Sequence, residues 1–208
     1  MTATQLEEIQ KGKSGIMPLT VEQYHRMAET GILQSGDPIE LLNGVLVYKD
    51  RSALGAPPMT VNPSHSFAIE QITELCEPLK RRGFRIRVQQ PISLPPGNEP
   101  EPDVAIARGK ARDFRDRHPS PSEVPCVFEV ADSSLPRDRT TKLEIYAENG
   151  IPTYIIVNLI DGAIEVYSNP IPHEKRFASL RTFGRGSGFS LEVGNGISVN
   201  FQVDDILA

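Results

Sequence analysis

The chain of 208 residues contains no tryptophan, only two cysteines and no long apolar run. A membrane-spanning helix needs about 20 apolar residues, so none is expected. The first residues carry neither a basic start nor an apolar core, and we therefore expect no secretory signal. Cys76 and Cys126 stand in apolar stretches, where buried free thiols are more common than a disulfide. These absences predict a globular protein of the cytoplasm.

Several catalytic arrangements are also missing from the sequence. No Ser-His-Asp or Cys-His triad stands out, no glycine-rich phosphate loop follows a strand, and no Cys/His spacing suggests zinc. A glycosidase with paired carboxylates would use aromatic side chains as sugar platforms, and a chain without tryptophan offers few of them. A hydrolase of that class is therefore the weaker alternative.

Positive charge is unevenly distributed along the chain. The net charge is −5, which taken alone argues against a nucleic-acid-binding protein. Between Lys80 and Lys142, however, there are 13 Lys or Arg against 9 Asp or Glu. This surplus is either an ordinary solvated surface or a docking surface for a polyanion, because local charge decides where a polyanion binds. Lys80-Arg81-Arg82 also has a plain explanation, since cations are favourable at the end of a helix.

Hydrophobic periodicity and turn residues predict a mixture of helices and strands. Thr20, followed three residues later by Gln23, forms a capping box before a short helix. Asn43-Gly44 accepts the positive φ angles of a type I′ turn and predicts a β-hairpin. Asp161-Gly162 predicts a second two-residue hairpin. The pattern also predicts a helix over residues 65–79, strands over residues 84–90 and 101–107, and further short strands in the C-terminal third.

The stretch Pro125–Leu159 reads as a strand, a polar loop, a helix and a second strand. The second strand is apolar enough to be buried on both faces, which is typical of a βαβ unit with parallel strands. Glu129 lies in the middle of the first, apolar strand. A carboxylate there costs free energy unless it is paired or binds a cation. Lys142, on the following helix, is the nearest candidate cation in the sequence.

Asp103 and Glu129 are the central candidate site residues. Asp103 begins a short strand, and the two carboxylates would converge on one point if the two strands were antiparallel neighbours. Mg²⁺, or Mn²⁺, is the natural neutraliser, because hard divalent cations prefer oxygen ligands. The carbonyl of Val130 is available as another oxygen ligand, and Glu40 could add a carboxylate from the first hairpin. Lys142 beside a metal-activated water could orient that water for attack on a phosphodiester.

The two central acids each have an alternative explanation. Asp103 could cap a turn after the preceding proline. Glu129 could form a buried structural ion pair with Lys142 or Arg139. The spacing of the acids along the chain leaves these alternatives open.

The neighbouring polar residues have structural explanations as well. Asp138, Lys142 and Tyr146 follow one another at i, i+4 and i+8 along one helical stripe. Asp138 and Lys142 could therefore form an ordinary helix salt bridge. His65 opens a helix, a position more typical of a partner for solvent or backbone than of a metal ligand.

Four segments occur in a characteristic order along the chain. They are Ile39-Glu40-Leu-Leu-Asn-Gly-Val-Leu-Val, Pro102-Asp103-Val-Ala, Phe128-Glu129-Val, and Asp138-x-x-x-Lys142-x-x-x-Tyr146-x-x-x-Gly150-Ile-Pro-x-Tyr154. This order closely resembles the Uma family, whose members are described as endonucleases. That family belongs to the restriction-endonuclease-like superfamily, named for its Pro-Asp and Asp/Glu-x-Lys motif. The likeness spans roughly residues 18–207, and the last segment is its most specific part.

The resemblance implies a role for each candidate residue. Asp103 and Glu129 would be metal ligands, Glu40 an accessory acid and Lys142 the catalytic lysine. In the common form of the superfamily the lysine lies two residues after the second acid, where this chain has Ala131. The family is understood to supply the lysine from the adjacent helix instead, which matches Lys142.

Two positions depart from the pattern of the family. This chain has Asn158 where the family tends to have an acid at the end of the buried strand. It also reads Asp132-Ser133-Ser134 where the family usually reads Ser-Pro-Ser.

Together these features predict an α/β (α+β) fold with a restriction-endonuclease-like core, a mixed central sheet flanked by helices, and an extra N-terminal helix and β-hairpin. Residues 1–17 would form a flexible arm and residues 18–208 a single domain. The first functional hypothesis is a magnesium-dependent endonuclease acting on DNA. The second is a nucleic-acid-binding or assembly module without turnover, which the acidic pI and the altered loop favour. A homodimer is expected, because cleavage of a duplex favours a two-fold symmetric enzyme.

Overall fold

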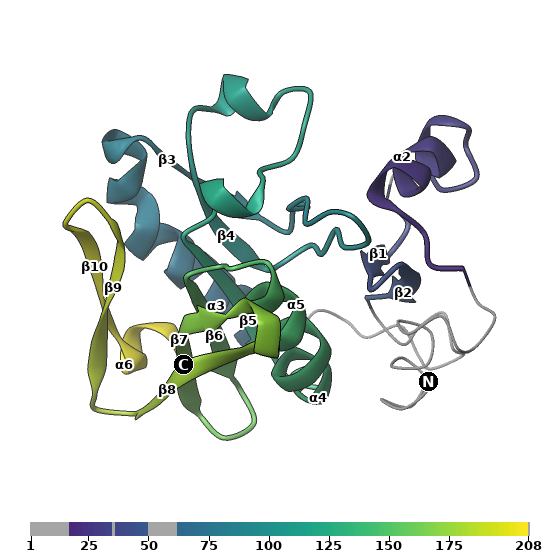
Figure 1. The fold of residues 1–208 in the computed structure, drawn as a ribbon. Coiled ribbons are helices and arrows are strands. Elements are labelled where there is room, and N and C mark those ends of the chain that lie inside the picture. Colours follow the sequence, from purple (N-terminus) through teal and green to yellow (C-terminus); the bar gives the residue numbers. More distant parts are fainter. Residues whose placement is uncertain (1–16, 35, 50–61, 208) are drawn as a thin grey trace. The chain divides into compact units, whose positions relative to one another are not determined.

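The computed structural model describes residues 17–34, 36–49 and 62–207 (Figure 1). The predicted N-terminal arm therefore lies outside the described residues, apart from Met17. The chain divides into two compact units, one made of residues 1–59 and 93–100 and the other of residues 60–92 and 101–208. The single domain expected over residues 18–208 stays a prediction.

The first unit contains a capped helix and a hairpin. Helix α2, Val21–Glu29, begins at the predicted capping box: the N–H of Gln23 donates to the Thr20 hydroxyl, and the Thr20 N–H donates to the Gln23 side chain. Strands β1, Ile39–Leu42, and β2, Val45–Tyr48, pair antiparallel. The φ angles of Asn43 and Gly44 are 53° and 73°, as a type I′ turn requires. Both local predictions are confirmed.

The second unit is built on a six-stranded mixed sheet in the order β3-β4-β5-β6-β7-β8 (Figure 1). Only β5 and β6 are parallel, and the remaining neighbours are antiparallel. The predicted βαβ unit and the mixed sheet are therefore confirmed. The strands are β3 Phe84–Val88, β4 Val104–Arg108, β5 Cys126–Ala131, β6 Thr153–Asn158, β7 Ala163–Ile171 and β8 Arg176–Gly184.

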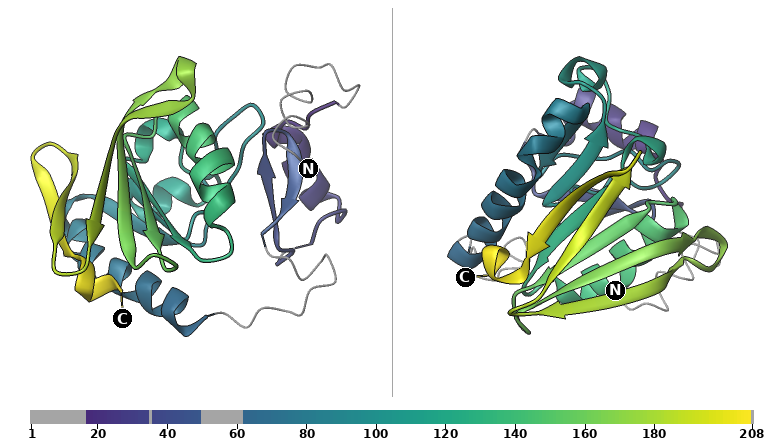
Figure 2. Two further views of the ribbon diagram at one scale, coloured as in Figure 1. Left: turned by 90° about the horizontal axis from the view of Figure 1, so that it is seen from below. Right: turned by 90° about the vertical axis from the view of Figure 1, so that its left-hand side faces the viewer.

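Helices cover both faces of this sheet (Figure 2). One face packs against helix α3, Pro63–Cys76, and the short helix α6, Val203–Ile206, together with the hairpin of β9, Gly188–Gly194, and β10, Ile197–Gln202. The core on this face contains apolar side chains from every one of these elements, among them Ile72, Phe128, Ile155, Phe201 and Val203.

The crossover between the parallel strands covers the other face. It consists of α4, Leu135–Arg137, a π-helical turn over Asp138–Lys142, and α5, Leu143–Glu148. Because side chains alternate along β5, Phe128 faces α3 and Glu129 faces this crossover helix. Short 3₁₀ turns complete the unit, over Glu77–Arg82, Ala111–Phe114, Pro121–Glu123 and Pro172–Glu174.

The two-residue hairpin predicted at Asp161-Gly162 is wrong in its length. Asn158 and Ala163 form the last pair between β6 and β7, so the loop has four residues. The side chain of Asn158 accounts for the longer loop, because its Oδ1 accepts hydrogen bonds from the N–H groups of Ile160 and Asp161. Such a side-chain turn competes with the tighter backbone turn.

Cys76 and Cys126 are both buried and free, as expected. Among the described residues, no helix combines the length and apolar character needed to cross a membrane.

Candidate active site

Asp103 and Glu129 lie on neighbouring antiparallel strands. Val104 of β4 pairs with Phe128 of β5, and continuing this register by one residue places Asp103 opposite Glu129. The carboxylate of Asp103 also accepts a hydrogen bond of 2.8 Å from the N–H of Val130, the residue next to Glu129. The condition on which the predicted pair depended, an antiparallel arrangement of these strands, is therefore met.

Glu129 is buried on β5 and held from the crossover helix. Its Oε1 atom accepts a hydrogen bond of 2.8 Å from the Lys142 ammonium and another of 2.8 Å from the Tyr146 hydroxyl. Glu129 and Lys142 are 4% and 5% exposed, so this ion pair is fully desolvated. A desolvated pair depends on good geometry and further hydrogen bonds, which Tyr146 provides.

Arg139, the other candidate partner of Glu129, binds a different acid. Its guanidinium forms a bidentate contact with the carboxylate of Glu165 on β7. Asn158 and Tyr167 donate further hydrogen bonds to the same carboxylate. Burial raises the pKa of Glu165, but these hydrogen bonds and the charge of Arg139 outweigh it and hold the pKa below its ordinary value. Asn158 thus belongs to a structural network.

His65 is a neighbour of Asp103 that the sequence pattern did not predict. Its Nε2 atom lies 3.4 Å from Oδ2 of Asp103. The hydrogen bond from His65 to Asp103 raises the pKa of His65, burial lowers it, and the charges of Asp103 and Asp132 with the Val130 backbone raise it further, so the net shift is upward. The capped start at Asn62 puts His65 in the first turn of α3, but no local signal shows that this turn meets β4.

Asp103 is kept anionic by its surroundings. Burial raises its pKa, but the hydrogen bond and charge of His65, the N–H of Val130 and the charge of Lys142 hold the pKa of Asp103 below its ordinary value. An anionic carboxylate is the form that binds a cation. The alternative in which Asp103 only caps a turn after its proline does not describe these partners, which come from α3, β5 and the crossover helix.

The groups around Asp103 and Glu129 fit a hard divalent cation. Two carboxylates and a backbone carbonyl at Val130 offer oxygen atoms, the donors that Mg²⁺ and Mn²⁺ prefer. The described part of the chain therefore supplies a donor set of the right chemistry at the ends of β4 and β5.

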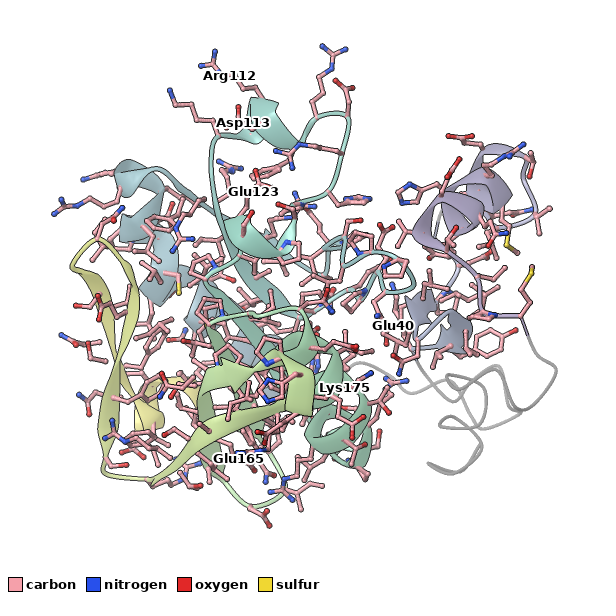
Figure 3. The ribbon with its side chains drawn as sticks, in the orientation of Figure 1. Glu40, Arg112, Asp113, Glu123, Glu165 and Lys175 are labelled. Atoms are coloured by element: carbon pink, nitrogen blue, oxygen red, sulfur yellow. The ribbon has the colours of Figure 1, made fainter. Side chains whose placement is uncertain are left out.

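Glu40 and Asp138 complete the set of residues singled out in the sequence. Glu40 lies on β1, where it pairs with Val47, and so belongs to the first compact unit (Figure 3). Its role as an accessory acid stays a prediction. Asp138 lies on the π-helical turn and is 1% exposed. Among the described residues no hydrogen bond joins the Asp138 carboxylate to Lys142, whose ammonium donates to Glu129 instead.

The stability of the protein should depend on the buried ion pair between Glu129 and Lys142. Lys142→Met is expected to lower the free energy of unfolding by about 3–5 kcal/mol, since Glu129 would be left as an uncompensated buried charge. Adding Glu129→Gln should restore part of that loss. Urea denaturation measures both, with Lys175→Met as the matched control. Lys175 pairs with Glu148 while both are 40% exposed, so its loss should cost about 0–1 kcal/mol. Equal losses for the two lysine variants would contradict a desolvated pair.

The contact between His65 and Asp103 predicts a pH-dependent stability. The pKa of His65 is raised in the folded protein, so its contribution is complete below the unfolded value of about 6.5 and is lost as the pH rises through the folded pKa. With a chelator present, His65→Gln should therefore destabilise the protein more near pH 6 than near pH 9. Urea midpoints at both pH values check this, and His173→Gln, at an exposed site, is the control. A loss independent of pH would exclude the charged contact.

Comparisons with known proteins place the chain in a family and identify a structure with the same fold. The family model described as "Uma2: Putative restriction endonuclease" matches residues 21–202. A solved structure described as "a putative nuclease belonging to DUF820", from Anabaena variabilis ATCC 29413, has the same fold with a TM-score of 0.66 at 12% identity. That similarity covers 91% of this chain and 97% of the other. A search of curated proteins found no match. The resemblance drawn from the motifs is confirmed, and the chain belongs to the Uma2 family of restriction-endonuclease-like proteins.

Proposed function

We propose that this protein is a magnesium-dependent endonuclease that hydrolyses phosphodiester bonds in DNA. Membership of the family makes its function nuclease-like. The observation that carries the finer proposal is the position of Asp103, next to the N–H of Val130 and opposite Glu129, with Lys142 bonded to Glu129. Two acids and a lysine at one point are the groups that phosphodiester hydrolysis uses.

Each residue of this proposed site has a separate task. Asp103, Glu129 and the Val130 carbonyl would hold Mg²⁺ or Mn²⁺. Such an ion, when bound, supplies positive charge at the scissile phosphate and makes water more acidic. Through the contact between them, His65 orients the Asp103 carboxylate and favours its ionised form. Lys142 supplies positive charge close to the phosphate, and such charge in a desolvated site stabilises the charge that develops in the transition state.

A binding module without turnover is the second candidate. The observation that favours it is the saturation of Glu129 Oε1, which already accepts hydrogen bonds from Lys142 and Tyr146. A carboxylate held in this way is also what a purely structural ion pair requires. Under this alternative the fold would bind nucleic acid without cleaving it.

A basic surface at the far end of β3 and β4 supports DNA as the substrate. Lys80, Arg81, Arg85 and Lys110 line a groove of about 340 Å³ there. Arg81, Arg85 and Lys110 form no ion pair among the described residues, whereas Lys80 pairs with Glu77 at 3.0 Å. Arg85 pairs with Ala107 of β4, four residues from Asp103, which is about 13 Å along a strand. Phosphates on both sides of a cleaved bond lie within such a distance.

The loop after β4 extends this basic surface. Phe114 anchors the loop, because the guanidinium groups of Arg87 and Arg117 lie 5.6 Å and 5.3 Å from the centre of its ring. Arg117 is in turn held by Glu123 in a bidentate ion pair. Arg112, on the same loop, is exposed (Figure 3). The loop therefore presents its charge from an ordered position.

Cleavage of plasmid DNA tests the proposed activity. With Mg²⁺ or Mn²⁺, the wild-type protein is expected to nick a supercoiled plasmid, and Asp103→Asn, Glu129→Gln and Lys142→Met should each lower the rate at least about 100-fold. Glu148→Gln, which removes an exposed carboxylate on α5, should cleave like the wild type. Glu40→Gln reports on the accessory acid. Equal cleavage by all the proteins would exclude the assigned site, and no cleavage by any of them would favour the binding module.

The salt dependence of DNA binding tests the basic surface. In EDTA, which separates binding from cleavage, Arg85→Gln combined with Lys110→Gln should reduce the slope of log K against log [salt] by about 2. Fluorescence anisotropy with a labelled duplex measures the slope. The control combines Lys175→Gln and Arg176→Gln, two exposed cations that are paired with Glu148 and Glu174. An unchanged slope in the first variant would place the duplex elsewhere.

The expected homodimer and the cytoplasmic location stay predictions. Neither is needed for the site, since Asp103, Glu129, Val130 and Lys142 all belong to one compact unit of one chain.

A further inference from the structure

Asp138 differs from the other buried acids of the second unit in the hydrogen bonding of its carboxylate. It is 1% exposed, and neither of its oxygen atoms has a hydrogen-bond partner among the described residues. The other buried acids of the sheet and crossover differ from it. Glu129 accepts hydrogen bonds from Lys142 and Tyr146, and Glu165 accepts them from three residues. Since buried polar groups are almost always satisfied, an exception calls for a functional reason.

The backbone holds Asp138 in this position. Its N–H donates to the carbonyl of Ser134, and its own carbonyl accepts a hydrogen bond of 3.1 Å from the hydroxyl of buried Tyr154. Asp138 also begins the π-helical turn that ends at Lys142. π-Helical turns are uncommon and occur often at functional sites. These backbone contacts therefore hold Asp138 inside the protein.

Lys142 is the cation close to Asp138. Four residues along a helix bring two side chains to the same side. Burial raises the pKa of Asp138, while the charge of Lys142, the Ser134 hydroxyl and the charge of Arg137 oppose the rise. The Lys142 ammonium thus acts on Asp138 through space, yet it donates its hydrogen bond to Glu129, 2.8 Å away. The charge of this ammonium acts on Asp138, while its hydrogen bond goes to Glu129.

A cation bound by Glu129 would change this balance. A divalent ion on the Glu129 carboxylate would repel the ammonium that now contacts the same carboxylate, since like charges in a site of low dielectric repel strongly. Breaking the hydrogen bond between the buried ammonium and Glu129 would cost free energy. A second buried acceptor close by would offset that cost.

We propose that Asp138 is this second acceptor, so that the Lys142 ammonium moves from Glu129 to Asp138 when Glu129 binds a divalent cation. One N–H···O hydrogen bond to Glu129 breaks and one to Asp138 forms, and no proton is transferred. Tyr146 keeps its hydrogen bond to Glu129 throughout. Asp138 is a positioning residue that acts through Lys142. This inference rests on the proposed function, because it assumes that Glu129 is a metal ligand.

Calorimetric titration with Mn²⁺ tests the proposal in a double-mutant cycle. Asp138→Asn should weaken Mn²⁺ binding about 10-fold or more, the range seen when a group behind a ligand is removed. In a Lys142→Met background the same substitution should have no further effect, because no ammonium remains to be relocated. If Lys142→Met does not fold, Lys142→Gln takes its place in the cycle. The matched control is Asp204→Asn, which changes an aspartate on α6 at the other side of the sheet.

The stability of the metal-free protein separates this role from a structural one. Asp138→Asn should leave the urea midpoint in EDTA unchanged or higher, because it removes a buried charge that is costly without an ion-pair partner. A large loss of stability there would overturn the proposal. An equal loss of Mn²⁺ affinity with and without Lys142 would overturn it too, and would make Asp138 a direct ligand.

A failure of the proposed function gives a different result. If the wild-type protein and all variants fail to bind Mn²⁺, both the metal site and the relocation of Lys142 are excluded. If the wild type binds Mn²⁺ and Asp103→Asn abolishes binding, the metal site is supported. The double-mutant cycle with Lys142 then tests the role of Asp138 separately.

Discussion

The hydrogen-bonded ion pair between Glu129 and Lys142 governs the second unit of this protein. A carboxylate in the middle of a buried strand is costly unless it is paired, and here the cation and the Tyr146 hydroxyl come from one helix. That helix is the crossover of the βαβ unit, so the pair also ties β5 to its own connection. The same contact that makes the strand tolerable places a lysine at the proposed site.

The antiparallel pairing of β4 and β5 contributes the second acid. Strand β5 uses one edge for a parallel neighbour and the other for an antiparallel one, and β4 begins where β5 approaches its end. Asp103, one residue before β4, therefore reaches the backbone of Val130. The end of a strand is also where the side chain of a helical residue, His65, can approach. A site at the ends of strands and next to a helix terminus can be rigid and still be reached by a large substrate.

The polar residues of the second unit fall into two groups with different physical roles. Arg139, Asn158 and Tyr167 all donate hydrogen bonds to Glu165, as is typical of a structural network. Asp138 is buried without a hydrogen bond beside a lysine that is bonded elsewhere. An unsatisfied group of this kind is costly, and its position near the proposed metal ligands suggests that the cost is tolerated for function.

The sequence by itself determined several local elements and singled out the acids and the lysine of the proposed site. The capping box at Thr20, the Asn43-Gly44 turn and the strand–helix–strand pattern around Glu129 are local signals, because each depends on a few consecutive residues, and all three formed as expected. The Asp161-Gly162 turn was misjudged because a side chain of the preceding strand, Asn158, enters the loop.

Only the tertiary structure decided which partners these residues take. The contact of His65 with Asp103 joins residues far apart in the sequence, and no local pattern shows which helix terminus meets which strand. The choice of Lys142 between Glu129 and Asp138, and of Arg139 for Glu165, depends on strand register and on the rotation of the crossover helix. Periodicity predicts the face on which a side chain lies, whereas packing decides what lies opposite it.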